Sequence, residues 1–273
     1  MKLRNNVEMP QVGLGVYKMT DEEETYRAIQ TALDTGYRMI DTASFYGNEE
    51  VVGRAIRESN VPREEIFVVT KIWNDDHGYT RAQEAIQTSL NRLGLDYVDA
   101  LLVHWPVPGK YVETYEAVLD AVGEGLVRVP GVSNHTEDQL TALFEAYGEY
   151  PVLNQVEYHP YLQQEALMKY CNERDIKVTA WSPIGRGKLL NDPIIQAIAS
   201  EYGVTPAQVI LRWHLQEGRI IIPKSVTPSR IAENFDLGSF ELADDAMTRI
   251  QSLSRDGRTG ANPYEPDFMN HFK

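Results

Sequence analysis

The sequence predicts an α/β fold, a (β/α)₈ TIM barrel, on three observations. Eight short apolar runs alternate with amphipathic stretches from one end of the chain to the other. Most of these runs are continuously apolar, as expected for parallel strands that are covered on both faces. The 273 residues are many for one ordinary domain but normal for such a barrel. No linker rich in Pro, Gly or Ser interrupts the pattern, so we expect a single domain over residues 1–273.

The predicted strands are short and evenly spread along the chain. They are Val12–Gly15, Met39–Asp41, Ile66–Lys71, Ala100–His104, Val129–Ser133, Val152–Glu157, Lys177–Trp181 and Ile220–Pro223. The first helix is expected to begin at a capping box, since Thr20 and Glu23 have the required spacing. Helices in this and two later stretches are expected to end at glycines, namely Gly36, Gly94 and Gly218.

Three segments depart from the plain repeat. Asn5-Asn6 is expected to form the turn of a short N-terminal hairpin that covers the bottom of the barrel. Pro130 lies within the fifth predicted strand and removes a ladder donor, so that strand is expected to start late or to bulge there. The tail from Arg255 to Lys273 has no clear period, which leaves both disorder and a folded tail open.

An open doubly wound sheet is the alternative fold. The stretch GLGVYKM supplies Gly13 and Gly15 but lacks the third glycine of the dinucleotide-binding fingerprint. The barrel is therefore the prediction.

The composition limits the partners and the compartment. The net charge of −14 argues against a nucleic-acid partner, which needs a basic face. One cysteine, Cys171, allows neither an intramolecular disulfide nor a multi-cysteine zinc site. No signal-like segment or membrane-length apolar run is present. We expect a cytoplasmic monomer without membrane or metal sites.

Polar residues follow the predicted strands, at the end of a barrel where chemistry takes place. Asp41, Lys71 and His104 each end a strand, and Tyr46 lies in the loop after Asp41. Each alone is explained by a turn, a surface or packing, but together they would converge on one pocket. A tyrosine whose pKa is lowered by a nearby lysine can act as a general acid. Asp41 would hold that lysine, and His104 would donate a hydrogen bond to a carbonyl oxygen.

Seven stretches, in order and across nearly the whole chain, resemble the aldo-keto reductase family. They are GYRMIDTASFYGNEEVVGRAI, TKIWN, LVHWP, GVSNH, NQVEYHP, AWSPIGRG and IPKSVTPSRIAEN. The chain is most similar to small bacterial members of the diketogluconate reductase type. The resemblance implies an NADPH-dependent carbonyl reductase on a (β/α)₈ barrel, with the catalytic tetrad Asp41, Tyr46, Lys71 and His104.

The resemblance also implies where the nicotinamide half of the cofactor binds. Ser133, Asn134 and Gln155 would bind its carboxamide, and their side chains have the necessary donors and acceptors. Trp181 would stack on the nicotinamide ring. Hydrogen bonds from these strand-end side chains to nearby backbone are the structural alternative.

The phosphates of the cofactor must be bound by other residues, because the chain lacks the glycine-rich dinucleotide-binding fingerprint. Lys224 and Arg230 supply a point charge and a planar fork, which suit a phosphate monoester. A solvated helix start with ordinary surface charge is the alternative. The resemblance places Gly185, Arg186 and Gly187 near the pyrophosphate. It assigns Lys224, Ser225 and Arg230 to the 2′-phosphate, and Glu233 and Asn234 to the adenine.

Aromatic residues are expected to shape the substrate pocket. By resemblance, the C-terminal tail folds back near the barrel mouth and forms the pocket with Tyr17, Trp73, His104 and Trp105. Trp105 is equally well explained as packing. His135 stands where relatives more often have phenylalanine, and it is expected either in the pocket or at a helix start.

The predicted function is NADPH-dependent reduction of aldehydes or ketones, with α-dicarbonyls or keto sugars as substrates and Tyr46 as the proton donor. Two alternatives remain open. Lys71 could form a Schiff base in a barrel aldolase, or the chain could bind NADPH as a sensor without turnover. The aldolase would leave Trp181 and the segment from Lys224 to Arg230 unexplained.

Overall fold

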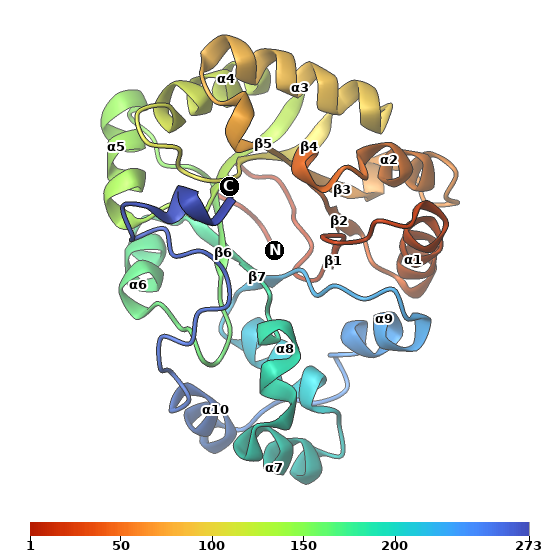
Figure 1. Ribbon diagram of the computed structural model, residues 1–273. Coiled ribbons are helices and arrows are strands. Elements are labelled where there is room, and N and C mark those ends of the chain that lie inside the picture. Colours follow the sequence, from red (N-terminus) through yellow and green to blue (C-terminus); the bar gives the residue numbers. More distant parts are fainter. Residues whose placement is uncertain (273) are drawn as a thin grey trace.

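Eight parallel strands form a ring in the computed structural model, which describes residues 1–272. Each strand pairs with the next in the order β1 to β8. A parallel bridge between Val12 and Ile221 closes the ring, and the Gly13 amide donates to the Ile221 carbonyl at 2.8 Å. Figure 1 views the molecule along the axis of the ring, with the helices arranged around the strands. The predicted (β/α)₈ barrel is confirmed.

The strands lie where the apolar runs predict them. They are β1 (Leu14–Gly15), β2 (Met39–Asp41), β3 (Phe67–Ile72), β4 (Val98–Val103), β5 (Val127–Ser133), β6 (Leu153–Glu157), β7 (Lys177–Trp181) and β8 (Ile220–Ile221). The first and last are only two residues long, shorter than predicted. Pairing between them continues outside these bounds, since the Gly15 amide donates to the Pro223 carbonyl at 3.2 Å.

Helices follow the strands around the outside. They are α1 (Glu22–Thr35), α2 (Glu49–Arg57), α3 (Tyr79–Leu93), α4 (Tyr111–Gly123), α5 (Glu137–Tyr147), α6 (Glu165–Glu173), α7 (Pro193–Tyr202), α8 (Pro206–Gln216), α9 (Pro228–Phe235) and α10 (Asp244–Gln251). Two helices, α7 and α8, separate β7 from β8, and α10 is an addition after α9.

The start of α1 differs from the predicted capping box. Asp21 caps the helix, and its Oδ1 accepts from the Glu24 amide at 2.7 Å. Three glutamates in the first turn add favourable charge at the positive end of the helix. The carboxylate one residue later takes the place expected for Thr20. Gly36 ends α1 in the left-handed region with φ 119°, as predicted.

Pro130 lies within a continuous β5 and opposite Leu101 of β4, so the predicted late start or bulge is wrong. Its carbonyl accepts from the Val152 amide at 3.0 Å, just before β6 begins at Leu153. In a parallel ladder the missing donor would point toward the same neighbour. It therefore falls where pairing with β6 has not yet started, and the ladder loses nothing.

Alternation along the strands separates two apolar layers. Met39, Phe67, Ala100 and Leu153 belong to a cluster inside the barrel. Side chains such as Ile40 belong to the larger cluster between strands and helices. Each strand therefore presents every second side chain to the barrel interior.

The two ends of the chain cover opposite ends of the barrel. The N-terminal hairpin is confirmed: Lys2 pairs with Glu8, and the Asn6 amide donates to the Leu3 carbonyl at 2.9 Å. Leu3 and Met9 complete the interior cluster from below. The C-terminal tail, as far as residue 272, is folded and crosses the other end of the barrel beside β6 (Figure 1). Within residues 1–272, no helix has both the length and the apolar character needed to cross a bilayer.

Candidate active site at the carboxyl ends of the strands

The predicted site residues share both an end of the barrel and a side of the strands. On β3, Phe67 and Val69 point into the barrel interior, and two-residue alternation carries Lys71 to the same side. On the other strands, two-residue alternation from the residues of the interior cluster likewise directs further side chains into the barrel. These are Asp41, His104, Ser133, Gln155, Trp181 and Lys224. Residues far apart in the sequence are thereby brought to one barrel mouth.

Lys71 is held in a fully buried position. Its ammonium donates to Oδ1 of Asp41 at 2.5 Å and to the Thr42 carbonyl at 2.8 Å. The Tyr46 hydroxyl lies 3.4 Å from the same nitrogen. Burial lowers the pKa of Lys71, and the Asp41 carboxylate opposes that effect. The three predicted residues do meet, with the lysine between the other two.

Tyr46 differs from the prediction in its acidity. Burial raises the pKa of Tyr46 well above its usual value, and the Asp41 and Tyr17 oxygens raise it further. The expected lowering by Lys71 is therefore wrong in this structure, because desolvation and a nearby carboxylate outweigh the cation. The hydroxyl remains protonated and available as a donor. The Tyr17 and His104 rings lie 5.0 and 5.8 Å from the Tyr46 ring, between centroids.

His104 is a neutral imidazole next to the tyrosine. Burial lowers its pKa well below the usual value, and the Lys71 charge adds to this shift. Its carbonyl accepts from the Asn134 amide nitrogen at 3.1 Å. Within residues 1–272, its Nδ1 is buried without a hydrogen-bond partner. A neutral ring carries one N–H, which suits donation to a carbonyl oxygen.

The residues predicted for the carboxamide form a connected network. Asn134 Oδ1 accepts from the Trp181 indole nitrogen at 2.8 Å, which fixes that ring at the mouth. Ser133 Oγ donates to the Gln155 carbonyl at 2.7 Å. Gln155 Nε2 donates to Oδ2 of Asp41 at 2.7 Å, so this network reaches the tetrad directly.

The residues predicted for the phosphates follow β7 and β8 at the same end of the barrel, with Arg230 in the first turn of α9. Lys224 and Arg230 are exposed, and neither forms an ion pair within the described part of the chain. Gly185 has φ 57°, and a Cβ there would lie 1.9 Å from Leu189 Cδ1, so only glycine fits. Arg186 and Gly187 follow, also with positive φ.

The remaining predicted residues near α9 are partly engaged in the fold. Ser225 Oγ accepts from the Thr227 amide at 3.1 Å, just before α9. Glu233 accepts from Thr205 Oγ1 at 2.8 Å, which orients it toward the start of α8. Asn234 is buried, with 5% of its surface exposed.

Aromatic rings line the mouth, and one of them was missed from the sequence. Trp73 meets the His104 ring edge-on at 5.0 Å. Phe45 stacks on Trp73 at 3.7 Å between centroids and keeps 48% of its surface exposed. A phenylalanine directly before the predicted catalytic Tyr46 was the available signal in the sequence. Trp105 is buried beneath Phe268 of the tail, so it acts at least as packing.

His135 lies immediately before the Thr136 cap of α5 and is buried. Its Nδ1 lies 2.9 Å from the Ser133 carbonyl, and its ring meets Tyr111 edge-on at 5.4 Å. Burial lowers its pKa to about 4. Its position is that of the predicted helix start.

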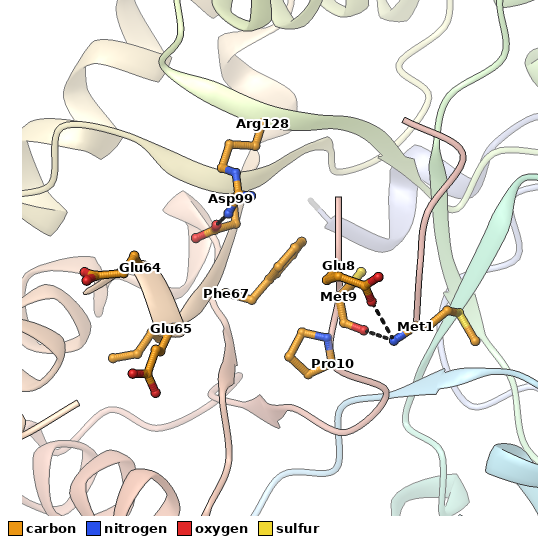
Figure 2. A pocket seen from close by; sticks show the side chains of 10 residues that line it. Met1, Glu8, Met9, Pro10, Glu64, Glu65, Phe67, Asp99 and Arg128 are labelled. Atoms are coloured by element: carbon orange, nitrogen blue, oxygen red, sulfur yellow. Dashed lines mark hydrogen bonds and ion pairs between the residues drawn. The ribbon is translucent and has the colours of Figure 1, made fainter. Parts of the chain in front are cut away.

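Two cavities lie apart from the tetrad. One of about 300 Å³ is lined by residues 1, 8–10, 64–67, 99 and 128, at the amino ends of the strands (Figure 2). Asp99 is already paired there with Arg128 at 2.7 Å. The other, of about 480 Å³, lies within the tail. Neither includes a tetrad residue, so the chemistry is assigned from the side chains at the strand ends.

Comparisons with known proteins agree with this geometry. Methylglyoxal reductase DkgA of Escherichia coli is 45% identical over 267 residues, which cover 96% of this chain and 96% of the relative. Glyoxal reductase of Bacillus subtilis is 45% identical over 265 residues, which cover 97% of this chain and 96% of the relative. A solved structure of a Gox0644 mutant in complex with NADPH has a TM-score of 0.92 at 42% identity, covering 96% of each chain. The model of the Aldo/keto reductase family matches residues 11–255. The chain belongs to the aldo/keto reductase family.

Proposed function

We propose that this protein is an NADPH-dependent reductase of small aldehydes and ketones, with Tyr46 as the proton donor. The observation that carries the proposal is the buried Lys71 ammonium, which lies between the Asp41 carboxylate and the Tyr46 hydroxyl. Neutral His104 stands beside them. A protonated acid, a neighbouring cation and a neutral donor are what carbonyl reduction requires of the protein.

The residues at the mouth fit NADPH. Lys224 and Arg230 are exposed cations without ion-pair partners in residues 1–272, on a chain of net charge −14, and would bind the 2′-phosphate with Ser225. The glycine-lined segment at 185–187 allows the pyrophosphate to approach the backbone. Glu233 and Asn234 would contact the adenine. Ser133, Asn134 and Gln155 would bind the carboxamide, with Trp181 against the ring. When bound, the reduced nicotinamide supplies the hydride.

The side chains of the tetrad would then handle the proton. His104 donates its N–H to the carbonyl oxygen and holds it near the Tyr46 hydroxyl. Tyr46 gives its proton to that oxygen as charge develops there, and a phenolate remains. The Lys71 ammonium, 3.4 Å away, stabilises the phenolate. Asp41 keeps the lysine charged and in place until water restores the proton.

The two alternatives lack comparable support. An aldolase Schiff base needs a neutral, accessible amine, whereas Lys71 is fully buried and its nitrogen has three oxygen neighbours. A sensor without turnover would not need a lysine buried against the tyrosine at the cost of desolvation.

The substrate class is proposed from the mouth and the relatives together. Phe45, Trp73 and Tyr17 form an aromatic rim around the polar tetrad, which suits a small carbonyl compound with an apolar part. Relatives at 45% identity are named for glyoxal and methylglyoxal. We therefore propose α-dicarbonyls as the preferred class, ahead of keto sugars.

The test is a steady-state assay of NADPH oxidation by the purified chain with glyoxal, methylglyoxal, a keto sugar and an aromatic aldehyde. The proposal predicts turnover with the α-dicarbonyls. NADPH binding without turnover on any carbonyl would favour the sensor. Borohydride trapping of a carbonyl compound on Lys71 would favour the aldolase.

A further inference from the structure

Glu157 is a buried carboxylate at the carboxyl end of β6 that belongs to none of the sets described above. It points into the barrel mouth, because it follows Leu153 and Gln155 at two-residue spacing. Its Oε1 accepts from the Thr259 amide at 2.7 Å and from Thr259 Oγ1 at 2.5 Å. Its Oε2 accepts from the Gly260 amide at 2.9 Å. These contacts join residues about a hundred positions apart.

These donors, with one histidine, satisfy the buried charge. The His159 ring nitrogen Nε2 lies 3.0 Å from Oε1, and within residues 1–272 no lysine or arginine pairs with Glu157. Burial raises the pKa of Glu157, but the hydrogen bonds from His159, Thr259 and Gly260 outweigh it, so the pKa lies below its usual value. The tail is therefore bound by an ionised acceptor, which forms stronger hydrogen bonds than a neutral one.

The same contacts set the tail directly against Trp181. Trp181 lies opposite Glu157 in the register of β6 and β7. A Cβ on Gly260 would lie 2.5 Å from Cη2 of the indole and 3.4 Å from Oε2 of Glu157. The backbone of the tail thus lies against both side chains at once, and a Cβ at position 260 would force the tail or the indole ring to move.

Beyond this point the tail forms the wall of the mouth. Ala261 and Phe268 pack on Trp105, and the Phe272 ring lies 5.3 Å from Trp73 and 4.8 Å from Trp105. The tail also lines the cavity of about 480 Å³, with residues between Asp256 and His271. The contacts of Thr259 and Gly260 with Glu157 lie directly before this wall, so the position of the wall depends on them.

We propose that Glu157 is a positioning residue that fixes Thr259 and Gly260 against Trp181 and so sets the width of the mouth for the carbonyl substrate. This role rests on the proposed reductase function. It makes the Glu157 contact a determinant of substrate discrimination between small and bulky carbonyl compounds. The attachment of Thr259 and Gly260 to Glu157 does not depend on a substrate, so it can be measured on the protein alone.

The first experiment is amide hydrogen exchange on full-length Glu157→Gln. A glutamine has one acceptor oxygen, so its NH₂ must face the Gly260 or the Thr259 amide, donor against donor. Exchange at these two amides should rise by roughly tenfold or more. The matched control is Glu137→Gln, which removes the charge of the carboxylate that accepts from the Tyr264 hydroxyl on the same tail. Unchanged exchange in Glu157→Gln would overturn the fixing role.

The second experiment is the ratio of kcat/KM for methylglyoxal to that for an aromatic aldehyde. Glu157→Gln and Gly260→Ala should each lower this ratio by roughly tenfold, mainly through KM, while the control keeps it. Gly260→Ala moves the tail without changing Glu157, so the test survives a folding failure of Glu157→Gln. Faster exchange with an unchanged ratio would overturn the specificity role. A wild-type chain without any carbonyl turnover would refute the reductase function instead, and exchange alone would then decide the fixing role.

Discussion

The ammonium of Lys71 lies 2.5 Å from Oδ1 of Asp41, with both side chains withdrawn from solvent. Two charges buried this deeply compensate each other, and removing one leaves the other without its counter-ion. The pair places a cation beside Tyr46 in a site where desolvation would otherwise favour neutral groups. Stability and proton transfer are therefore linked at this pair.

Lys71→Met should lower both stability and turnover. The unpaired Asp41 should cost about 3–5 kcal/mol of unfolding free energy. Turnover should fall, and the tyrosine limb of the pH–rate profile should move to higher pH, because the phenolate loses its stabilising cation. Denaturant unfolding and the pH profile are the measurements. The double variant Asp41→Asn with Lys71→Met should recover part of the stability but none of the rate, whereas an unchanged rate and pH profile in Lys71→Met would make Lys71 merely structural.

His135→Phe should flatten the acid side of the stability profile. The folded pKa of His135 is about 4, and an unfolded histidine titrates near ~6.5. Between these values the unfolded chain binds a proton that the folded chain does not, so stability falls as pH falls through that window. Near pH ~5 the wild type should have lost about 2 kcal/mol to this group alone.

The measurement is the free energy of unfolding of wild type and His135→Phe across this pH range. The difference should shift in favour of the variant as the pH falls from ~6.5 to ~4. His271→Phe, at an exposed position, is the control. Parallel profiles for wild type and His135→Phe would show that His135 takes up its proton in the fold.

Arg230→Ala should separate the two nicotinamide cofactors. A charge-assisted contact to phosphate contributes about 1.5–3 kcal/mol, so NADPH binding should weaken by roughly tenfold or more. NADH lacks the 2′-phosphate and should lose much less. Calorimetry at fixed salt gives both dissociation constants, and Arg81→Ala on α3 is the control. Equal losses for NADPH and NADH would remove Arg230 from the 2′-phosphate site.

Phe45→Ala should act on the substrate rather than on the cofactor. The Phe45 ring stacks on Trp73 at 3.7 Å, and Trp73 in turn meets His104. Losing the stack should raise KM for an α-dicarbonyl by up to roughly tenfold. The dissociation constant of NADPH should stay near that of wild type. Phe144→Ala, an exposed aromatic on α5, is the matched control, and a normal KM in Phe45→Ala would exclude Phe45 from the pocket rim.

The sequence was sufficient for the ring of strands and for the meeting of Asp41, Tyr46 and Lys71. Apolar runs mark the strands, and two-residue alternation carries Asp41 and Lys71 into the mouth. Tyr46 was expected there because it lies in the loop that follows Asp41. Glu157 follows the same alternation from Gln155 and could have been found by the same count. Its partners, Thr259 and Gly260, could not, because the tail has no period that predicts where it lies.

The failed predictions depended on surroundings that a sequence does not show. The acidity of Tyr46 was expected to be raised by Lys71, but the balance is decided by how completely the fold removes water. Pro130 was expected to disturb β5, yet its effect depends on where the neighbouring β6 begins. Thr20 and Asp21 are both good caps, and which one is used depends on the path of the chain after β1.

The most direct test of the reductase function is the rate of methylglyoxal-dependent NADPH oxidation by Tyr46→Phe, measured together with its NADPH dissociation constant. The variant keeps the ring against Tyr17 and His104 but removes the only proton that Tyr46 can give. Turnover should drop by roughly 10²-fold or more, with NADPH binding almost unchanged. Near-normal turnover in Tyr46→Phe would contradict the assignment of Tyr46 as the proton donor.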